Sequence, residues 1–281
     1  MRALAALLLV LALLPLAHAA TVSQPVYTVG DAWEYEGNAT ASAGTAQLRR
    51  HVEVVEAGEE IVLRWVTQTR TSLGSNGTID QWFWYRAGDL ALLRTASYTK
   101  ATTANASSEA RALTNYTTPC VERAYPLEVG KAWIVGCGGS RTTMTETRRV
   151  DDSESRRENA TVEREGTTVA PSGTFPTVRV VHQATSTDDR NEAEYAQSAC
   201  NDATIRNLRR GTTTELALVA WRCASTRTAG GTLTITLPPT PSFDPPAPTV
   251  VSVPQHAQPA PGLVGLVAAV GALALARRAK R

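Results

Sequence analysis

Short runs rich in β-branched and aromatic residues alternate with turn signals along most of this 281-residue chain. In the first half, the runs that we expect to be strands lie at residues 47–55, 61–69, 78–86 and 90–98. In the second half they lie at 141–150, 161–169, 174–187, 192–198, 204–209 and 213–222, with a last edge strand at 232–237. Turns spaced about 8–12 residues apart are typical of an all-β sheet or barrel. The sequence therefore predicts a mainly β, antiparallel fold.

The pattern Val-Gly-x-Ala-Trp occurs twice, 100 residues apart, at residues 29–33 and 129–133. A run of expected strands follows each copy, and the spacing is too long for a solenoid repeat. We therefore expect two related β-modules, at residues 20–118 and 119–236, each an open curved sheet or half-barrel. In each copy we expect the glycine to adopt a positive φ and the tryptophan to cap a sheet.

Two segments of the first half stand out by composition. Residues 99–118 are rich in Thr, Ala, Asn and Ser, which predicts an exposed loop or a mobile link. Residues 82–85 read Trp-Phe-Trp-Tyr, and alternation along a strand places Trp82 and Trp84 on one face. Core packing is one interpretation of this strand. A platform on which Trp82 and Trp84 stack against a lipid or glycan ligand is the other.

The four cysteines of the chain predict two disulfides. An even number of cysteines in an exported protein favours disulfide bonding, and four allow three connectivities. Cys200 and Cys223 lie at nearly equal distances on either side of a turn at residues 210–212, and Cys120 and Cys137 flank residues 126–130. Hairpins would therefore join Cys120 to Cys137 and Cys200 to Cys223. A zinc site is the alternative, but the sequence has no Cys-x-x-Cys pair and no histidine beside the cysteines.

The first 19 residues have the form of a cleavable secretory signal. Arg2 precedes an apolar run over residues 3–17, and Ala17-His18-Ala19 gives a small-x-small cleavage pattern. We expect the mature chain to begin at Ala20. An uncleaved anchor is the alternative, although the apolar run is short for a span of about 20 residues.

The other end combines a stalk with a short apolar tail. Nine of residues 237–262 are proline, which favours a semi-rigid polyproline stalk. Residues 263–276 are apolar or glycine, and the basic residues after them would lie in the cytoplasm, so the rest of the chain would face outward. The tail at 263–281 therefore predicts attachment to the membrane and a place on the extracellular side of the cell membrane.

Pro261, Gly262 and Leu263, the apolar run and the basic cluster together resemble the PGF-CTERM sorting signals of archaeal surface proteins. In that family an archaeosortase recognises the tail and removes it, and the resemblance implies a sortase-like processing enzyme and a lipid anchor for this chain. Leu263 stands where the family has phenylalanine. A plain transmembrane anchor is the alternative.

A second resemblance covers Tyr125 to Trp221. The segment from Tyr125 to Trp133, the segment VAPSGTFPTVRV at 169–180 and an aromatic strand around Tyr195 resemble exported LolA-like and DUF3108-type β-rich proteins. The resemblance implies an open, strongly curved antiparallel sheet. Some members of this wider group carry lipids or lipoproteins on the concave face, and no catalytic residues come with it.

Asn-x-Ser/Thr sequons predict N-glycosylation on surface loops. They occur at Asn38, Asn76, Asn105, Asn115 and Asn159, each without proline in the middle position. The alternative is that these triplets occur by chance, because the chain is rich in threonine.

The sequence contains no motif of a known catalytic centre. His51 and His182 are the only histidines outside the signal and the stalk, and each stands alone in an expected strand. The acidic residues at 151–152 and 188–194 lack calcium-loop spacing, and they favour solvated loops over a calcium site. Without the two ends, 23 basic residues face 26 acidic ones, so no basic stripe indicates a nucleic-acid partner.

These observations predict a non-enzymatic, membrane-anchored cell-surface protein without a cofactor, which binds a hydrophobic ligand or an envelope component. A structural or adhesive envelope protein is the second hypothesis. A glycan-active enzyme is the third, and it requires two carboxylates that face a cleft.

Overall fold

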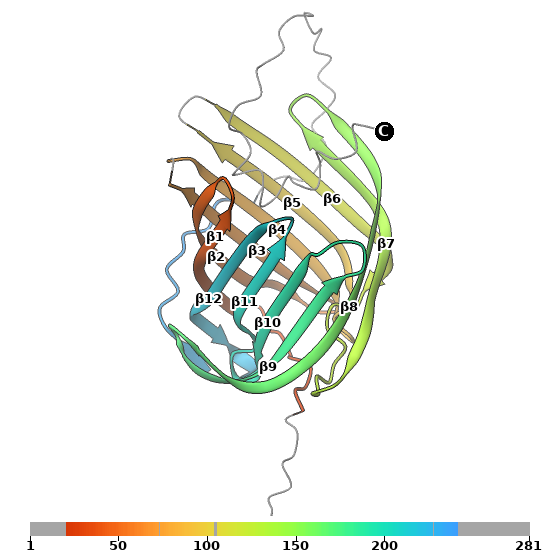
Figure 1. The fold of residues 1–281 in the computed structure, drawn as a ribbon, viewed down its shortest axis with the longest axis vertical. Helices are drawn as coiled ribbons and strands as arrows, with labels where there is room; N and C mark the ends of the chain where they lie inside the picture. The colour runs from red at the N-terminus through yellow and green to blue at the C-terminus, as the bar shows by residue number, and fades with distance from the viewer. Residues whose placement is uncertain (1–20, 73, 104–105, 227, 241–281) are drawn as a thin grey trace, which may run out of the picture.

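A computed structural model describes residues 21–72, 74–103, 106–226 and 228–240 (Figure 1). The predicted signal at 1–19, most of the predicted stalk at 237–262, the predicted sorting motif at 261–263 and the predicted tail at 263–281 lie outside these residues. The strands are β1 (Ala32–Ala41), β2 (Gly44–Ala57), β3 (Glu60–Thr71), β4 (Asn76–Arg86), β5 (Leu92–Thr102), β6 (Ser107–Cys120), β7 (Ala132–Thr145), β8 (Arg149–Ala170), β9 (Gly173–Ala184), β10 (Arg190–Ala196), β11 (Asn201–Arg209), β12 (Thr212–Cys223) and β13 (Thr228–Gly230).

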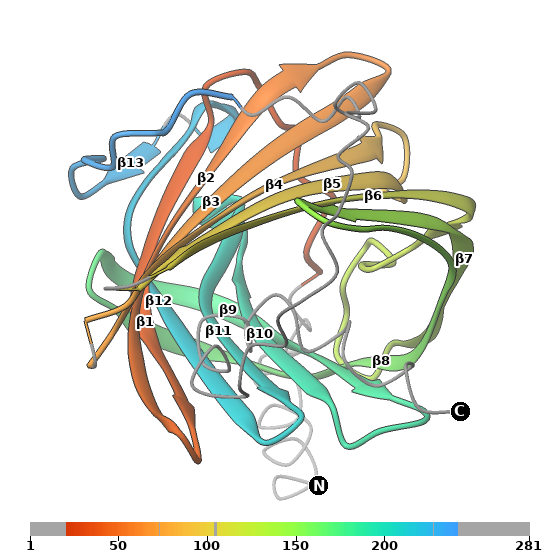
Figure 2. The same ribbon diagram turned by 90° about the horizontal axis from the view of Figure 1, so that it is seen from above.

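Strands β1 to β12 form one closed antiparallel barrel. Each strand pairs with its neighbours in chain order, and β1 pairs with β12 from Ala32↔Arg222 to Thr40↔Thr213. Figure 2 shows the resulting ring from above. The mainly β prediction is confirmed, whereas the expectation of two open sheets is wrong. A half-barrel would leave long unpaired edges, and pairing β1 with β12 removes them.

The two copies of the repeated motif make the same turn before β1 and β7. Gly30 and Gly130 have φ of +90° and +86°, as expected. Their N–H groups donate to the carbonyls of Val54 and Val162, which are 3.0 and 2.9 Å away. The tryptophans that follow, Trp33 and Trp133, point into the barrel. Each copy therefore opens a set of six strands, β1–β6 and β7–β12.

The two ends of the barrel differ. Five short turns and one five-residue connection, the links that follow the odd-numbered strands from β1 to β11, form the end that we call the rim (Figure 1). The opposite end, which we call the base, is covered by residues 21–31 and 121–131 and by the 3-10 helix η1 (Gln197–Ala199). An isolated bridge between Val22 and Leu127 ties the first two segments together.

Two turns at the rim lie where the sequence predicted no turn, and the strand boundaries predicted there are wrong. Residues 141–150 were expected to be one strand, and 99–118 a loop, but β7 ends at Thr145 and β6 runs through Ser107–Cys120. Both turns lack glycine and proline. Instead, the hydroxyls of Thr103 and Thr145 accept hydrogen bonds from backbone N–H groups three residues on, at 3.1 Å each. Such threonine turns carry little sequence signal.

After β13, residues 231–240 cross the outside of the barrel, and we call this segment the strap. The N–H groups of Thr234 and Ile235 donate to Glu34 at 2.6 and 2.8 Å, and Arg64 donates to the carbonyl of Pro238 at 2.7 Å. The edge strand expected at 232–237 is therefore absent, because side chains of β1 and β3 hold the strap's backbone groups and β13 occupies the edge of β12.

Both disulfides that the sequence favours are present. Cys120 is bonded to Cys137, and Cys200 to Cys223. All four cysteines are buried at or near the base, where the first disulfide joins β6 to β7. The first therefore links the two six-strand sets. In the chain-entropy model, each loop is worth about 3 kcal/mol.

Candidate functional site

The strand pairing decides which side chains face the interior. On β2, Leu48, Val52 and Val54 are buried in the core, so Arg50, which alternates with them, also faces inward. Its neighbour Arg49 faces outward, with 47% of its side chain exposed. The same alternation assigns the inner and outer faces of the other strands.

Aromatic side chains seal the base of the interior. Trp33 donates its indole N–H to the carbonyl of Ala199, and Trp133 donates to that of Val121 at 3.2 Å. The hydroxyl of Tyr35 donates to the carbonyl of Asp202 at 3.0 Å. Buried indole and phenol groups need such partners, so these bonds fix the covering segments to the strands.

Several charged groups at the base form ion pairs. Arg123 contacts both carboxylate oxygens of Asp202 at 2.6 Å, and its guanidinium lies 4.9 Å from the ring centre of Tyr195. Arg156 donates to Glu122 at 2.6 Å and to Glu158 at 2.7 Å. Buried ion pairs require this geometry, because each charge loses its hydration.

The pKa of Glu158 reflects this pairing. Burial alone would raise the pKa, but the nearby His182, 3.4 Å away, and the hydrogen bonds from Arg156 outweigh it and lower the pKa of Glu158 to about 2. The pKa of Glu122 is also lowered, since Arg156 outweighs the effect of burial. Both carboxylates therefore stay ionised at neutral pH, as structural partners of Arg156.

Beyond the base, the inner wall of β5–β8 is polar and reached by solvent. Thr95, Ser97 and Thr99 of β5 are partly exposed although the pairing turns them inward. Across the wall, Arg141 and Glu154 form a 3.4 Å ion pair with 24% and 31% of their side chains exposed. A barrel of eight strands is just filled by its own side chains, and twelve strands enclose more space. The interior is therefore accessible on this side.

A different arrangement occupies the inner wall of β2–β4. The guanidinium of Arg50 lies 5.1 Å from the ring centre of Trp65, and its Nε donates to Thr67 at 3.0 Å. Beside Arg50 the inner wall is apolar, because the inward-facing rings of Trp65 and Phe83 lie 4.6 Å apart. Burial lowers the pKa of Arg50 to about 10, so it remains a cation at neutral pH.

Trp82 and Trp84, the predicted stacking platform, lie on the outer face of β4. Their rings are 6.3 Å apart, and Arg64 and Arg94 lie over them at 5.3 and 4.4 Å. They therefore do not line the interior, whereas Trp65 and Phe83 do. Sequence reasoning missed Arg50, although its place between Leu48 and Val52 was a signal.

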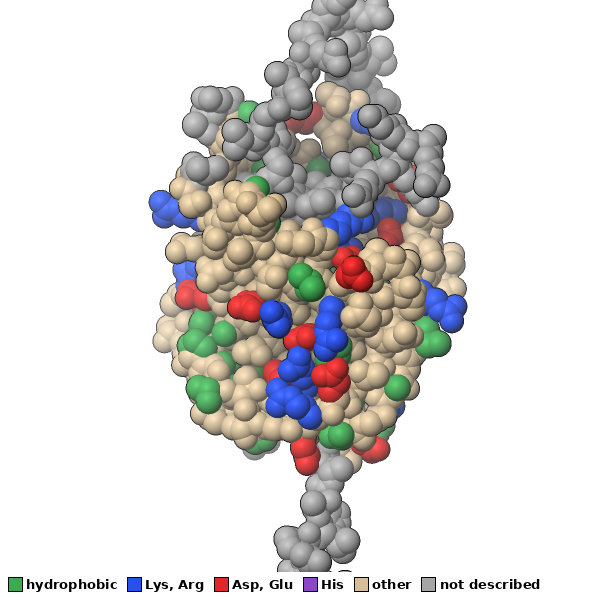
Figure 3. Space-filling model, viewed as in Figure 1, with side chains coloured by type: hydrophobic (Ala, Val, Ile, Leu, Met, Phe, Trp, Pro, Cys, Tyr) green, Lys and Arg blue, Asp and Glu red, His purple; other side chains and the backbone are tan. Residues whose placement is uncertain are grey.

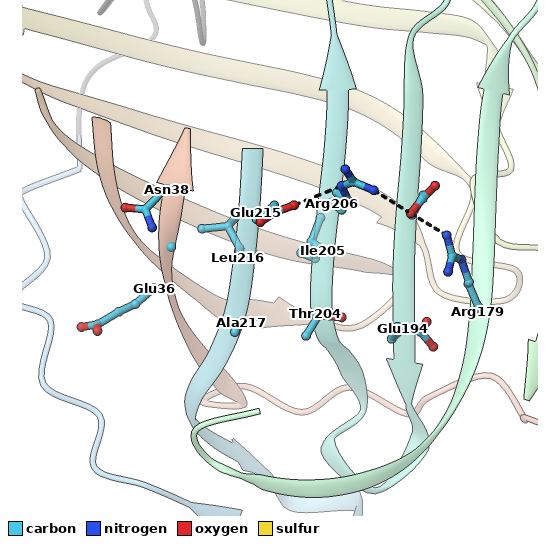
Figure 4. A pocket seen from close by; sticks show the side chains of 12 residues that line it. Glu36, Asn38, Arg179, Glu194, Thr204, Ile205, Arg206, Glu215, Leu216 and Ala217 are labelled. Atoms are coloured by element: carbon cyan, nitrogen blue, oxygen red, sulfur yellow. Dashed lines mark hydrogen bonds and ion pairs between the residues drawn. The ribbon is translucent and has the colours of Figure 1, made fainter. Parts of the chain in front are cut away.

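The outer wall of β8–β12 carries rows of alternating charge (Figure 3). Arg206 pairs with Glu215 at 3.1 Å, and Arg179 with Glu192 at 2.6 Å. A hollow of about 530 Å³ lies among these side chains, and its floor includes Thr204 and Ala217 (Figure 4). The hollow is shallow and open, and its arginines have carboxylate partners.

The sequons lie on the outer surface wherever the structure describes them. Asn38, Asn76, Asn115 and Asn159 are all exposed, whereas Asn105 lies outside the described residues. Asn191, Asn201 and Asn207, which are not in sequons, are buried or partly buried.

The two histidines lie in separate places. His51 faces outward between Glu34 and Glu53, and His182 faces inward, 6.0 Å from the ring centre of Trp133. Of the acidic residues considered for calcium, Asp151 contacts Arg149 at 3.1 Å, and Glu192 contacts Arg190 at 2.6 Å. No group of three or more metal-binding side chains occurs within the described ranges.

No family model, curated protein or solved structure matches this chain. The resemblances to archaeal sorting signals and to LolA-like proteins therefore stay predictions. No helix in the part of the chain that the structure covers is long and apolar enough to cross a membrane.

Proposed function

We propose that this chain is a non-enzymatic cell-surface protein, attached to the membrane through its C-terminus, whose barrel binds a small molecule in its interior. One observation carries the proposal: the base is sealed, while the inward-facing wall of β5–β8 is polar and partly exposed. This arrangement gives a container with one closed end. A ligand would replace the solvent that contacts Thr95, Ser97 and Arg141.

Two further observations support a place outside the cell. The chain holds two disulfides, which persist in oxidising compartments. The four described sequon asparagines are exposed, as glycan carriers must be. Membrane attachment, removal of the tail by a sortase-like enzyme, and glycosylation belong to this proposal.

Native mass spectrometry of the oxidised chain, before and after denaturation, tests the proposal. We expect a discrete additional mass that leaves on denaturation. Ser97→Trp should fill the interior and abolish this mass. Lys100→Trp is the matched control, because Lys100 lies outward on the same strand and is half exposed. A wild-type protein without additional mass, or equal retention in both variants, would contradict the proposal.

A structural or adhesive role is the second candidate, and the outer wall of β8–β12 favours it. Its rows of alternating charge and its hollow could contact an envelope component. Self-association or binding of isolated envelope material that Arg206→Glu weakens, combined with an empty interior, would support this second role.

A further inference from the structure

One inward-facing arginine differs from the others. The pairing places Arg50, Arg141 and Arg156 on the inner side below the rim, and Arg123 of the base contacts Asp202 and the ring of Tyr195. Arg123, Arg141 and Arg156 each have a carboxylate at 2.6–3.4 Å. For Arg50, no carboxylate of the described residues lies within 4 Å. Among the inward-facing arginines that the structure describes, Arg50 is therefore the one whose charge no described carboxylate balances within 4 Å.

A second donor without an acceptor lies beside it. The indole N–H of Trp65 is buried and has no hydrogen-bond partner among the described residues. Because Arg50 lies over the Trp65 ring, the two side chains form one unit. Thr67 accepts from Nε of Arg50 and so orients the guanidinium, while no acceptor contacts its two terminal nitrogens in the described chain. The unit therefore presents an excess of donors.

Physical chemistry indicates what would complete this unit. A buried charge or donor without a partner is costly, whereas a guanidinium pairs with carboxylate or phosphate through two parallel hydrogen bonds. Acceptors for the terminal nitrogens of Arg50 and for the indole N–H of Trp65 would therefore come from outside the described chain, from solvent or from a ligand. Arg50 and the ring of Trp65 are both partly exposed, so solvent reaches this point of the interior, and a ligand would reach the buried indole nitrogen by displacing the groups that cover it.

We infer that Arg50 and Trp65 form the anchoring site for an oxyanion, a carboxylate or a phosphate, on a ligand with an apolar planar body. The inference rests on the proposed function and names the ligand class. Arg50 pairs with the oxyanion, and the N–H of Trp65 donates to it. The tilted pair of Trp65 and Phe83 offers an apolar surface for the body of the ligand.

The same wall continues with polar groups. Gln81 lies opposite Trp65 on β4, and Ser97 lies opposite Gln81 on β5. Thr95 of β5 lies opposite Phe83 of β4, two residues along from that pair. A ligand held at Arg50 would extend along these rows toward the solvent-accessible side of the interior. Its distal part would therefore meet hydroxyl and amide groups.

Calorimetric titration with benzoate and with phenyl phosphate tests the inference, and benzyl alcohol is the neutral counterpart. We expect saturable binding of at least one anion, and binding of benzyl alcohol that is at least tenfold weaker. Arg50→Gln should weaken anion binding at least tenfold, and Arg50→Lys should weaken it by a smaller factor. Trp65→Phe keeps the ring but removes the N–H, so we expect a loss of about three- to tenfold. Arg49→Gln is the control on the outer face and should change nothing.

The outcomes separate this inference from the proposed function. If Ser97→Trp abolishes a copurifying mass while Arg50→Gln leaves that mass and anion binding unchanged, the anion site is wrong and the container stands. Equal affinity for benzyl alcohol and benzoate would also overturn the anion site. If the wild-type protein carries no mass and binds none of the three probes, both ideas fail. Thermal unfolding of Arg50→Gln shows whether a loss of binding reflects misfolding, and we expect an unchanged or higher Tm.

Discussion

The two six-strand sets, β1–β6 and β7–β12, begin with the same turn but differ on both faces of the wall. Inside, the first set carries Arg50 without a carboxylate, whereas the second carries Arg141 and Arg156 in ion pairs. Outside, the strap covers part of the first set, whereas the second exposes its charge rows. The shared turn serves to start the first strand of each set. Under the proposed function, these differences would put the anchoring group for a ligand in the first set. They leave the outer wall of the second set open to solvent.

The junctions between the sets are where they are most alike, and they give the largest expected effect. Each junction carries a bulge and a glycine: a Cβ on Gly37 would overlap the backbone of Glu215, and one on Gly139 that of Asn115. We expect Gly37→Ala and Gly139→Ala each to lower the free energy of unfolding by about 3 kcal/mol, because the strands must move apart. Chemical denaturation measures this.

Gly136→Ala is the control for both variants, since a Cβ there meets no atom within 4 Å. A loss at one junction only would show that the two sets are joined differently despite their common turn.

The next prediction contrasts two interior arginines. Arg123→Met should cost about 3 kcal/mol, because it leaves Asp202 buried without its partner. Arg50→Met should change stability by less than about 1 kcal/mol, because it removes a cation that has no carboxylate. Thermal unfolding of both variants, without added ligand, checks this. Equal losses would indicate that Arg50 is a structural residue like Arg123.

The smallest expected effect is on the stability of the fold at acid pH. The pKa of Glu158 is depressed to about 2, so its ionised form stabilises the fold above the unfolded pKa of about 4.3, and this contribution is lost as the pH falls toward 2. We expect Glu158→Gln to be less stable than wild type by about 2 kcal/mol at neutral pH. The difference should shrink below pH of about 4.

Denaturation at a series of pH values measures this difference. Glu215→Gln is the matched control, because Glu215 is 65% exposed beside Arg206, and a pH-independent small effect is expected there. A constant difference for Glu158→Gln down to low pH would show that its charge does not stabilise the base.

Local patterns in the sequence predicted the β class, the repeated turn and both disulfides. Each of these depends on residues close in the chain or symmetric about a turn. Closure of the barrel depends on pairing β1 with β12, almost 200 residues apart, and no local pattern encodes it. Sheet curvature decides whether such edges meet.

Which face of a strand turns inward was harder to predict than the strand itself. Trp82 and Trp84 were correctly placed on one face of β4, but that face is the outer one. An apolar stripe normally marks the inner face, and β4 has aromatic residues on both. Likewise, residues 99–118 contain threonine and alanine where a filled core would need larger apolar groups, because they line an accessible interior. The alternation of Leu48, Val52 and Val54 along β2 did indicate that Arg50 faces inward.

The strap has a mechanical consequence. A pull on the chain at Thr240 would load the hydrogen bond between Pro238 and Arg64 first, and then the two bonds to Glu34. These contacts lie one after another along the strap, so they would break in sequence rather than together. Tension would therefore be dissipated on the outside of the barrel before it reached β13 and the seam between β12 and β1. The strap would thus detach before the barrel that it crosses is strained.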